Sequence, residues 1–139
     1  MVIMVMDGQG GGIGLVIIKA LRTTVAEDVE ILALGTNSAA TARMMKAGAN
    51  RGATGENAIV QTSPKADVIM GPLAILMPHA MMGEVTTRMA EAVSASSAKK
   101  ILIPLTQEKV RLVGVTADPL PHLVEEAVRV LKQIILVPA

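Results

Sequence analysis

The residues best suited to chemistry in this chain form a glycine-rich turn close to its start. An apolar run, Val2–Met6, leads into Asp7 and then into the sequence Gly-Gln-Gly-Gly-Gly-Ile-Gly. Glycine has no Cβ, so the chain can turn sharply there and bring its N–H groups close to a ligand. A helix that begins in such a turn directs the positive end of its dipole at the same place. A phosphate-binding turn is therefore predicted at Gly8, Gln9, Gly10, Gly11, Gly12, Ile13 and Gly14.

Asp7 stands directly before this turn, where its negative charge would repel a phosphate. Two roles remain open for it. Its carboxylate can brace the turn by accepting hydrogen bonds from backbone N–H groups, or it can help to hold a metal ion that bridges to phosphate.

A second cluster of small and polar residues follows the apolar run 29–34 and contains Thr36, Asn37 and Ser38. An acidic residue at this point would hold the ribose hydroxyls of NAD. Neutral hydroxyl and amide groups leave room for a phosphate, which favours NADP over NAD if the ligand is a dinucleotide. The alternative is that Asn37 or Ser38 only caps the next helix. We expect Arg43 to be a solvent-exposed helix residue rather than a phosphate clamp.

Later strand candidates end in similar clusters, which contain Glu56 with Asn57, Gly71 with Pro72, and Thr106 with Gln107. Glu56 and Asn57 can face a ribose or a substrate. Alternatively, they form only the first turn of a helix that Thr54 caps. His79 follows the fourth strand candidate, and a half-buried or hydrogen-bonded histidine is expected there rather than a catalytic one.

The composition excludes several kinds of catalysis. The sequence has no Tyr, Phe, Trp or Cys, and it has 10 Met. No mechanism can use a tyrosine as general acid, and thiolate nucleophiles, disulfides and Cys-based metal sites are absent. His79 and His122 lack the spacing of a metal site. We therefore expect no metal site, and no catalytic set can be identified.

Alternating strand-like and helix-like segments position these residues. Strands are predicted at 2–6, 29–34, 51–53, 67–70 and 100–105. Helices are predicted at 13–24, 39–47, 82–97 and from 121 onward, and a short helix follows the turn 54–57 and ends at about 63. Residues 110–115 are strand-like too, but the preceding link is too short for a parallel crossover. The prediction is a three-layer, Rossmann-like α/β sandwich whose mostly parallel sheet has an antiparallel edge strand. Its ligand would lie beyond the carboxyl ends of the strands.

Size and charge limit the class of protein further. The 139 residues suit a single domain, 1–139, and 13 Lys and Arg against 12 Asp and Glu do not suit a nucleic-acid binder. The most apolar stretch, 68–82, is interrupted by Gly71, Pro72 and Pro78 and is too short to span a membrane. No basic leader precedes the first strand, so a cytoplasmic protein is expected.

An apolar content of 51% favours a homo-oligomer. One possible interface is the predicted helix 82–97, where Val85, Met89 and Val93 lie near helical spacing. The methionines are expected mainly to fill a core that lacks aromatic rings.

The spacing Gly8-x-x-x-Gly12-Ile13-Gly14 resembles the glycine turn of short-chain dehydrogenases/reductases. This resemblance covers the first third of the chain. It implies that Gly8, Gly12 and Gly14 cradle a pyrophosphate. The Tyr-x-x-x-Lys catalytic pair of that family cannot exist here, because the chain has no tyrosine.

The whole chain also resembles a small uncharacterised bacterial family. Its members share the turn Asp-Gly-Gln-Gly-Gly-Gly-Ile-Gly and later segments such as Ala33–Asn37, Gly52–Ala58, Gly83-Glu84 and Ile103–Leu105. This resemblance implies a Rossmann-like fold and adds no activity.

These observations together predict a nucleotide- or dinucleotide-binding protein, with NADP or NAD as ligand, that acts as a ligand-binding or sensing module. One alternative is a small NAD(P)-dependent oxidoreductase, in which the cofactor supplies the chemistry. A second alternative is a structural oligomer subunit that binds no nucleotide.

Overall fold

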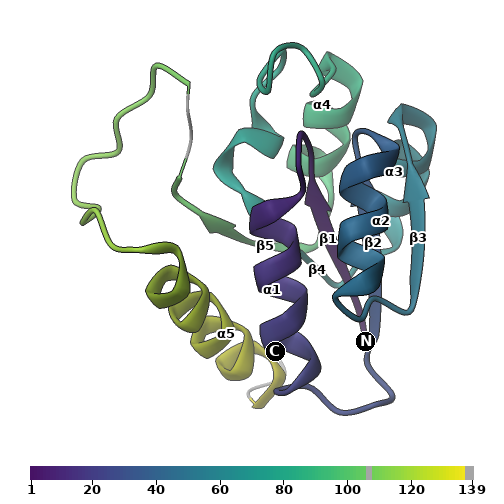
Figure 1. Cartoon of the computed structure of the whole chain (residues 1–139), viewed down its shortest axis with the longest axis vertical. Helices are drawn as coiled ribbons and strands as arrows, with labels where there is room; N and C mark the ends of the chain where they lie inside the picture. Colours follow the sequence, from purple (N-terminus) through teal and green to yellow (C-terminus); the bar gives the residue numbers. More distant parts are fainter. Residues whose placement is uncertain (106–107, 137–139) are drawn as a thin grey trace.

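The computed structural model describes residues 1–105 and 108–136, which form a five-stranded parallel sheet between two layers of helices (Figure 1). The strand order is β3-β2-β1-β4-β5. The strands are β1 (Val2–Asp7), β2 (Glu30–Gly35), β3 (Arg51–Thr54), β4 (Val68–Pro72) and β5 (Lys99–Ile103). At the centre, Val5 lies opposite Ala33 of β2 on one side and Met70 of β4 on the other. This is the order of the first five strands in the doubly wound dinucleotide-binding fold.

Alternate residues of β1 supply the two cores, as the period of a strand requires. Ile3 and Val5 pack with Leu21 of α1 and Leu131 of α5, whereas Met4 and Met6 face the opposite core. The helices are α1 (Gly12–Arg22), α2 (Ser38–Lys46), α3 (Glu56–Thr62), α4 (Thr87–Ala95) and α5 (Leu120–Leu136), with 3-10 turns η1 (Ser63–Lys65) and η2 (Leu73–Leu76). The three-layer α/β architecture is confirmed. Methionines fill both cores, as expected, because Met4, Met6, Met44, Met70 and Met89 are all buried.

The antiparallel edge strand predicted at 110–115 is wrong. These residues form an exposed loop that swings away from the sheet before α5 begins (Figure 1). Alternating apolar residues show that a segment is able to pair, but pairing needs the edge of a neighbouring strand and a layer that covers the apolar side chains. No such layer covers Val113, which is fully exposed. Thr106 and Gln107 lie outside the described residues.

The predicted helix 82–97 is shorter than expected and begins at Thr87. The backbone of Met81, Met82 and Gly83 is left-handed, with φ of 58°, 56° and 91°, and cannot continue a helix. Thr86 caps α4 by accepting a hydrogen bond from Met89 N at 3.2 Å.

The oligomer interface suggested for this helix is also wrong. Val85, Met89 and Val93 are buried within the chain itself and belong to the core that contains Met4 and Met6. They leave no apolar face for a partner, because intramolecular packing already uses it.

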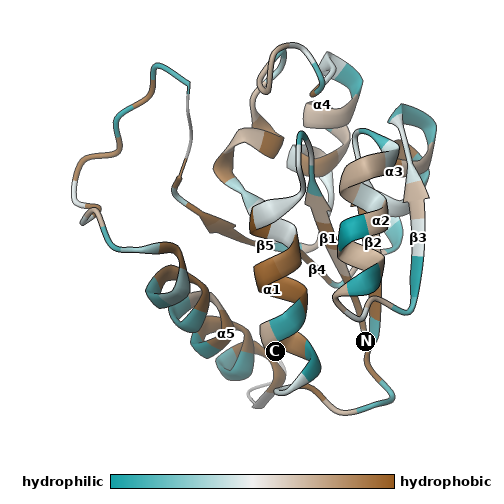
Figure 2. Cartoon of the chain, viewed as in Figure 1, coloured by the Kyte–Doolittle hydropathy of each residue, from teal (hydrophilic) through white to brown (hydrophobic). Residues whose placement is uncertain are grey.

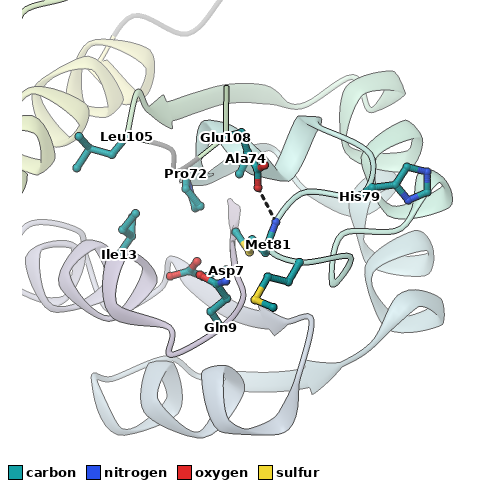
Figure 3. A pocket seen from close by; sticks show the side chains of 10 residues that line it. Asp7, Gln9, Ile13, Pro72, Ala74, His79, Met81, Leu105 and Glu108 are labelled. Atoms are coloured by element: carbon teal, nitrogen blue, oxygen red, sulfur yellow. Dashed lines mark hydrogen bonds between the residues drawn. The ribbon is translucent and has the colours of Figure 1, made fainter. Parts of the chain in front are cut away.

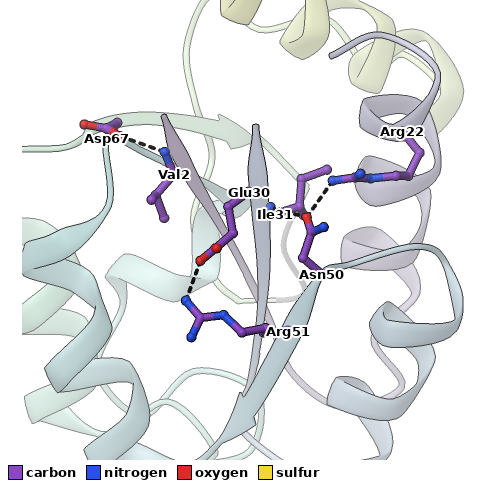
Figure 4. A network of polar contacts seen from close by, with 7 residues as sticks. All are labelled: Val2, Arg22, Glu30, Ile31, Asn50, Arg51 and Asp67. Atoms are coloured by element: carbon purple, nitrogen blue, oxygen red, sulfur yellow. Dashed lines mark hydrogen bonds and ion pairs between the residues drawn. The ribbon is translucent and has the colours of Figure 1, made fainter. Parts of the chain in front are cut away.

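Polar contacts fasten the opposite, amino-terminal edge of the sheet (Figure 4). Asn50 Oδ1 accepts from Ile31 N and from the Arg22 guanidinium, both at 2.8 Å, which ties β2 to α1. Asp67 Oδ2 accepts from Val2 N at 2.7 Å. These contacts position the strands whose other ends carry the candidate site. Within the described ranges, no helix has the length and apolarity needed to cross a bilayer.

Candidate functional site

An open cavity of about 640 Å³ lies beyond the carboxyl ends of β1 and β4 (Figure 3). The strand order changes direction between these two strands, which is where α/β sheets form their ligand crevices. The sequence prediction placed the ligand at this edge of the sheet. The cavity is lined by Asp7, Gln9, Ile13, Pro72, Ala74, His79, Met81, Met82, Leu105 and Glu108.

Asp7 is the buried acid of this cavity and is 4% exposed. Its Oδ1 accepts from Gly8 N at 2.8 Å, and its Oδ2 accepts from Gly14 N at 2.7 Å. Burial raises the pKa of the Asp7 carboxyl above its usual 3.8, and the backbone hydrogen bonds offset only part of that effect. Of the two roles left open by the sequence, bracing the turn is confirmed. No cluster of three His, Cys, Asp or Glu side chains in residues 1–105 and 108–136 is placed to hold a metal ion.

Close packing explains two of the turn's glycines. A Cβ on Gly8 would lie 2.5 Å from both Met81 Sδ and Thr36 Oγ1, and one on Gly14 would lie 2.4 Å from Met44 Sδ. Gly12 differs, because no atom lies within 4 Å of its Cβ position. The start of α1 is therefore open to solvent at Gly12, while the turn is filled on either side.

The side chains of Thr36 and Asn37 are both hydrogen-bonded to Glu84. Thr36 Oγ1 donates to Glu84 Oε1 at 2.7 Å, and Asn37 Nδ2 donates to the same oxygen at 2.8 Å. The backbone N–H of Gln9 is a third donor to that oxygen, at 2.8 Å. Burial acts to raise the pKa of Glu84, but these three hydrogen bonds outweigh it and lower the pKa below the usual 4.5.

Asn37 is also the cap of α2, because its Oδ1 accepts from Ala40 N at 2.9 Å. The capping role is thus confirmed alongside the contact with Glu84. Ser38 is the first, exposed residue of α2.

Sequence reasoning missed the part that Glu84 plays. Glu84 lies 48 residues after Thr36, in the loop 77–86 that joins η2 to α4. No local spacing connects it to β2. The dipeptide Gly83-Glu84 stood out only as a match to the bacterial family.

Arg43 lies closer to the glycine turn than expected. Its Nη1 donates to the Gly10 carbonyl at 2.7 Å, although the side chain is on the exposed side of α2. The guanidinium therefore brings one positive charge to a turn that already has two carboxylates beside it, Asp7 and Glu84.

The remaining candidates divide between the cavity and other contacts. Pro72 lines the cavity, and a Cβ on Gly71 would lie 2.3 Å from Met6 O, so glycine allows β4 to approach β1. Glu56 instead accepts from Thr86 Oγ1 at 2.6 Å and pairs with Arg88 at 3.5 Å, which links α3 to α4. Its neighbour Asn57 is likewise in the first turn of α3, away from the cavity lining.

The alternative in which Thr54 caps α3 is wrong. Gly55 occupies the cap position, and Thr54 Oγ1 is hydrogen-bonded to Thr41 Oγ1 at 2.7 Å instead.

The loop 77–86 carries the most unusual backbone of the site. His79, Met81 and Met82 line the cavity and have φ of 70°, 58° and 56°, a region that residues with a Cβ rarely adopt. The His79 imidazole points away from the centre of the cavity (Figure 3). Met81 N donates to Glu108 Oε1 at 2.8 Å, and His79 N donates to Val85 O at 2.6 Å. Such conformations persist only when surrounding contacts hold them, and they are common at ligand sites.

Comparison with known proteins identifies a family and a distant structural likeness. No curated protein matches the sequence. One solved structure, a dodecameric FMN-dependent UbiX-like decarboxylase from Escherichia coli O157:H7, is 17% identical, with a TM-score of 0.47 over 96% of this chain and 75% of that chain. Such a low score says nothing about activity. The family described as "Domain of unknown function (DUF3842)" matches residues 2–136. With nearly the whole chain covered, this protein belongs to that family.

Proposed function

We propose that this protein binds a nucleotide or dinucleotide in the cavity between the carboxyl ends of β1 and β4. The observation that carries the proposal is the position of this cavity at the change in strand order, beside the glycine turn and the start of α1. Its volume of about 640 Å³ lies within the range of roughly 300–1,000 Å³ that is usual for small-molecule sites.

The surroundings of the turn support a phosphate there. Backbone N–H groups at a helix start favour anions, and α1 begins in the open region around Gly12. Arg43 adds a positive charge beside the turn, through its hydrogen bond to the Gly10 carbonyl. NADP and NAD remain the finer candidates from the sequence. Of the glycines predicted to form the cradle, Gly8 and Gly14 already donate their N–H groups to Asp7 and Gly11 donates to Gly8 O, so Gly10 and Gly12 are the ones proposed to meet the phosphate.

A binding or sensing role suits this site better than catalysis. Asp7 is the buried acid of the cavity, and both its oxygens accept backbone hydrogen bonds that hold the turn, which assigns it to structure rather than to proton transfer. The oxidoreductase alternative would place all the chemistry on the cofactor.

Binding can be tested with little background, because the chain has no Tyr or Trp and barely absorbs in the near ultraviolet. The purified protein should be scanned for a ligand band and then heated with AMP, ATP, NAD, NADP and FMN in separate samples. At 100 times its dissociation constant, a ligand should add about 2.7 kcal/mol to the free energy of unfolding. A clean spectrum together with unchanged melting temperatures for all five compounds would reject the proposal.

The variant Gly12→Val locates the site in the same assay. Its side chain enters open space, so the fold should persist while ligand affinity falls by about tenfold or more. Thr87→Val, which also places a valine at the first position of a helix, is the control and should bind normally. Normal binding by Gly12→Val would show that the turn is not the cradle.

A further inference from the structure

We infer that the ligand is a mononucleotide-sized molecule held on the β4 side of the crevice, because the chain's own Glu84 fills the β2 side. This inference rests on the proposed function and names the size class of its ligand. It favours one half of a dinucleotide over NAD and NADP themselves.

The contacts of Glu84 carry the first step. In doubly wound folds, the end of β2 receives the ribose of the adenosine half of a dinucleotide. Here the donors at that place, Thr36 Oγ1 and Asn37 Nδ2, both donate to Glu84 Oε1, at 2.7 and 2.8 Å. A carboxylate with several donors makes charge-assisted hydrogen bonds, which are stronger than neutral ones. An incoming ribose or phosphate would have to replace it.

The packing over the turn carries the second step. Neither Met81 Sδ nor Thr36 Oγ1 leaves room for even one added carbon at Gly8, since both would lie 2.5 Å from a Cβ there. The space beside Gly8, beyond the carboxyl ends of β1 and β2, is therefore filled by Thr36 and by Met81 of the loop 77–86. Consistent with this, none of the residues that line the cavity comes from β2 or α2.

Charge carries the third step. Glu84 Oε1 lies 2.8 Å from Gln9 N, so its negative charge is already beside the turn that a pyrophosphate would cross. A pyrophosphate at this point would meet a like charge in direct contact with the turn, and like charges repel. A single phosphate at the start of α1 can keep to the β4 side, whereas a dinucleotide has to extend toward β2.

Titration calorimetry on the full chain tests this directly. AMP, nicotinamide mononucleotide and FMN are compared with NAD and NADP, and the best mononucleotide should bind at least about tenfold more tightly than either dinucleotide. Glu84→Ala should raise the affinity for NAD or NADP by about tenfold and leave that for the mononucleotide within about threefold. Glu91→Ala removes an exposed carboxylate from α4 and should change neither affinity.

Glu84→Gln is the control for a general loss of structure in Glu84→Ala. Its amide oxygen can still accept from the same donors, so the loop should stay in place while the charge disappears, and dinucleotide affinity should rise by a smaller factor. Circular dichroism and thermal melting confirm folding of each variant. Tight binding of NAD or NADP to the wild type, or a size preference that Glu84→Ala leaves unchanged, would overturn the inference alone. Failure of every nucleotide to bind would instead reject the proposed function, and the inference with it.

Discussion

At the scale of single residues, two carboxylates govern the environment of the glycine turn. Asp7 holds the turn from inside through the N–H groups of Gly8 and Gly14, and Glu84 covers it from outside. Their pKa values move in opposite directions, because burial dominates at Asp7 and hydrogen bonds dominate at Glu84. The turn is thus shaped by acceptors that the protein itself supplies.

Asp7 should show a pKa above 3.8 in the folded chain. Since the folded state then binds its proton more tightly than the unfolded state, the free energy of unfolding should fall as pH rises from 3.8 to the folded pKa, and level off above it. Titration of the Asp7 carboxyl carbon by NMR measures the pKa, and a midpoint at or below 3.8 would contradict the prediction.

The matched variant is Asp7→Asn, which keeps the shape but has one acceptor oxygen in place of two. It should lose this part of the pH dependence in urea unfolding. It should also be less stable by about 1–2 kcal/mol at neutral pH, because one buried N–H loses its acceptor.

At the scale of elements, the apolar pattern of a segment predicts a helix well, but it does not predict which segments pair in a sheet. Helix α5 was expected from its apolar periodicity, and Val124, Ala127, Val128 and Leu131 are indeed buried. Figure 2 shows the resulting division of α5 into an apolar inner side and a polar outer side. Residues 110–115 have a strand pattern of comparable clarity, yet they pair with nothing in the part of the chain that the structure describes.

Leu131→Ala should destabilise the protein by about 2–5 kcal/mol, because Leu131 is fully buried between α5 and the core around Ile3 and Val5. Lys132→Ala, on the exposed side of the same helix, should change stability by less than about 0.5 kcal/mol. Urea unfolding measures both. Equal effects would mean that α5 does not dock as described.

At the scale of the whole molecule, the loop that precedes α5 is the most conspicuous apolar surface. Val110, Leu112, Val113 and Val115 are exposed along it, although the chain buries most of its other large aliphatic side chains. Exposed apolar segments of this kind commonly mark contacts between proteins. The expected homo-oligomer remains a prediction, and we propose this loop, rather than α4, as its interface.

Analytical ultracentrifugation should find the wild-type chain at twice the monomer mass or more. The double variant Leu112→Lys and Val113→Lys should shift it toward monomer, since lysines at a buried interface leave charges without solvent. Val130→Lys, an equally apolar-to-charged change at an exposed position on α5, is the control. A monomeric wild type would remove the prediction.

The sequence by itself determined the five parallel strands, the glycine turn and the layered α/β class, although it also predicted a strand at 110–115 that does not form. Val2–Met6 and the turn after it can be predicted because their signals are local. A continuous apolar run indicates a strand buried on both faces, and consecutive glycines indicate a tight turn. The same local information located Asp7 and gave bracing of the turn as one of two roles for it.

Only the tertiary structure decided what surrounds the turn. Glu84 meets Thr36 and Asn37 across 48 and 47 residues, a contact that depends on the course of the loop 77–86. The absence of an acid after β2 in the sequence favoured NADP, but folding brings a carboxylate to that position from elsewhere. The sequence could not decide either whether residues 110–115 pair with β5. Pairing depends on two segments and on the layer that covers them, whereas an alternating pattern is a property of one segment.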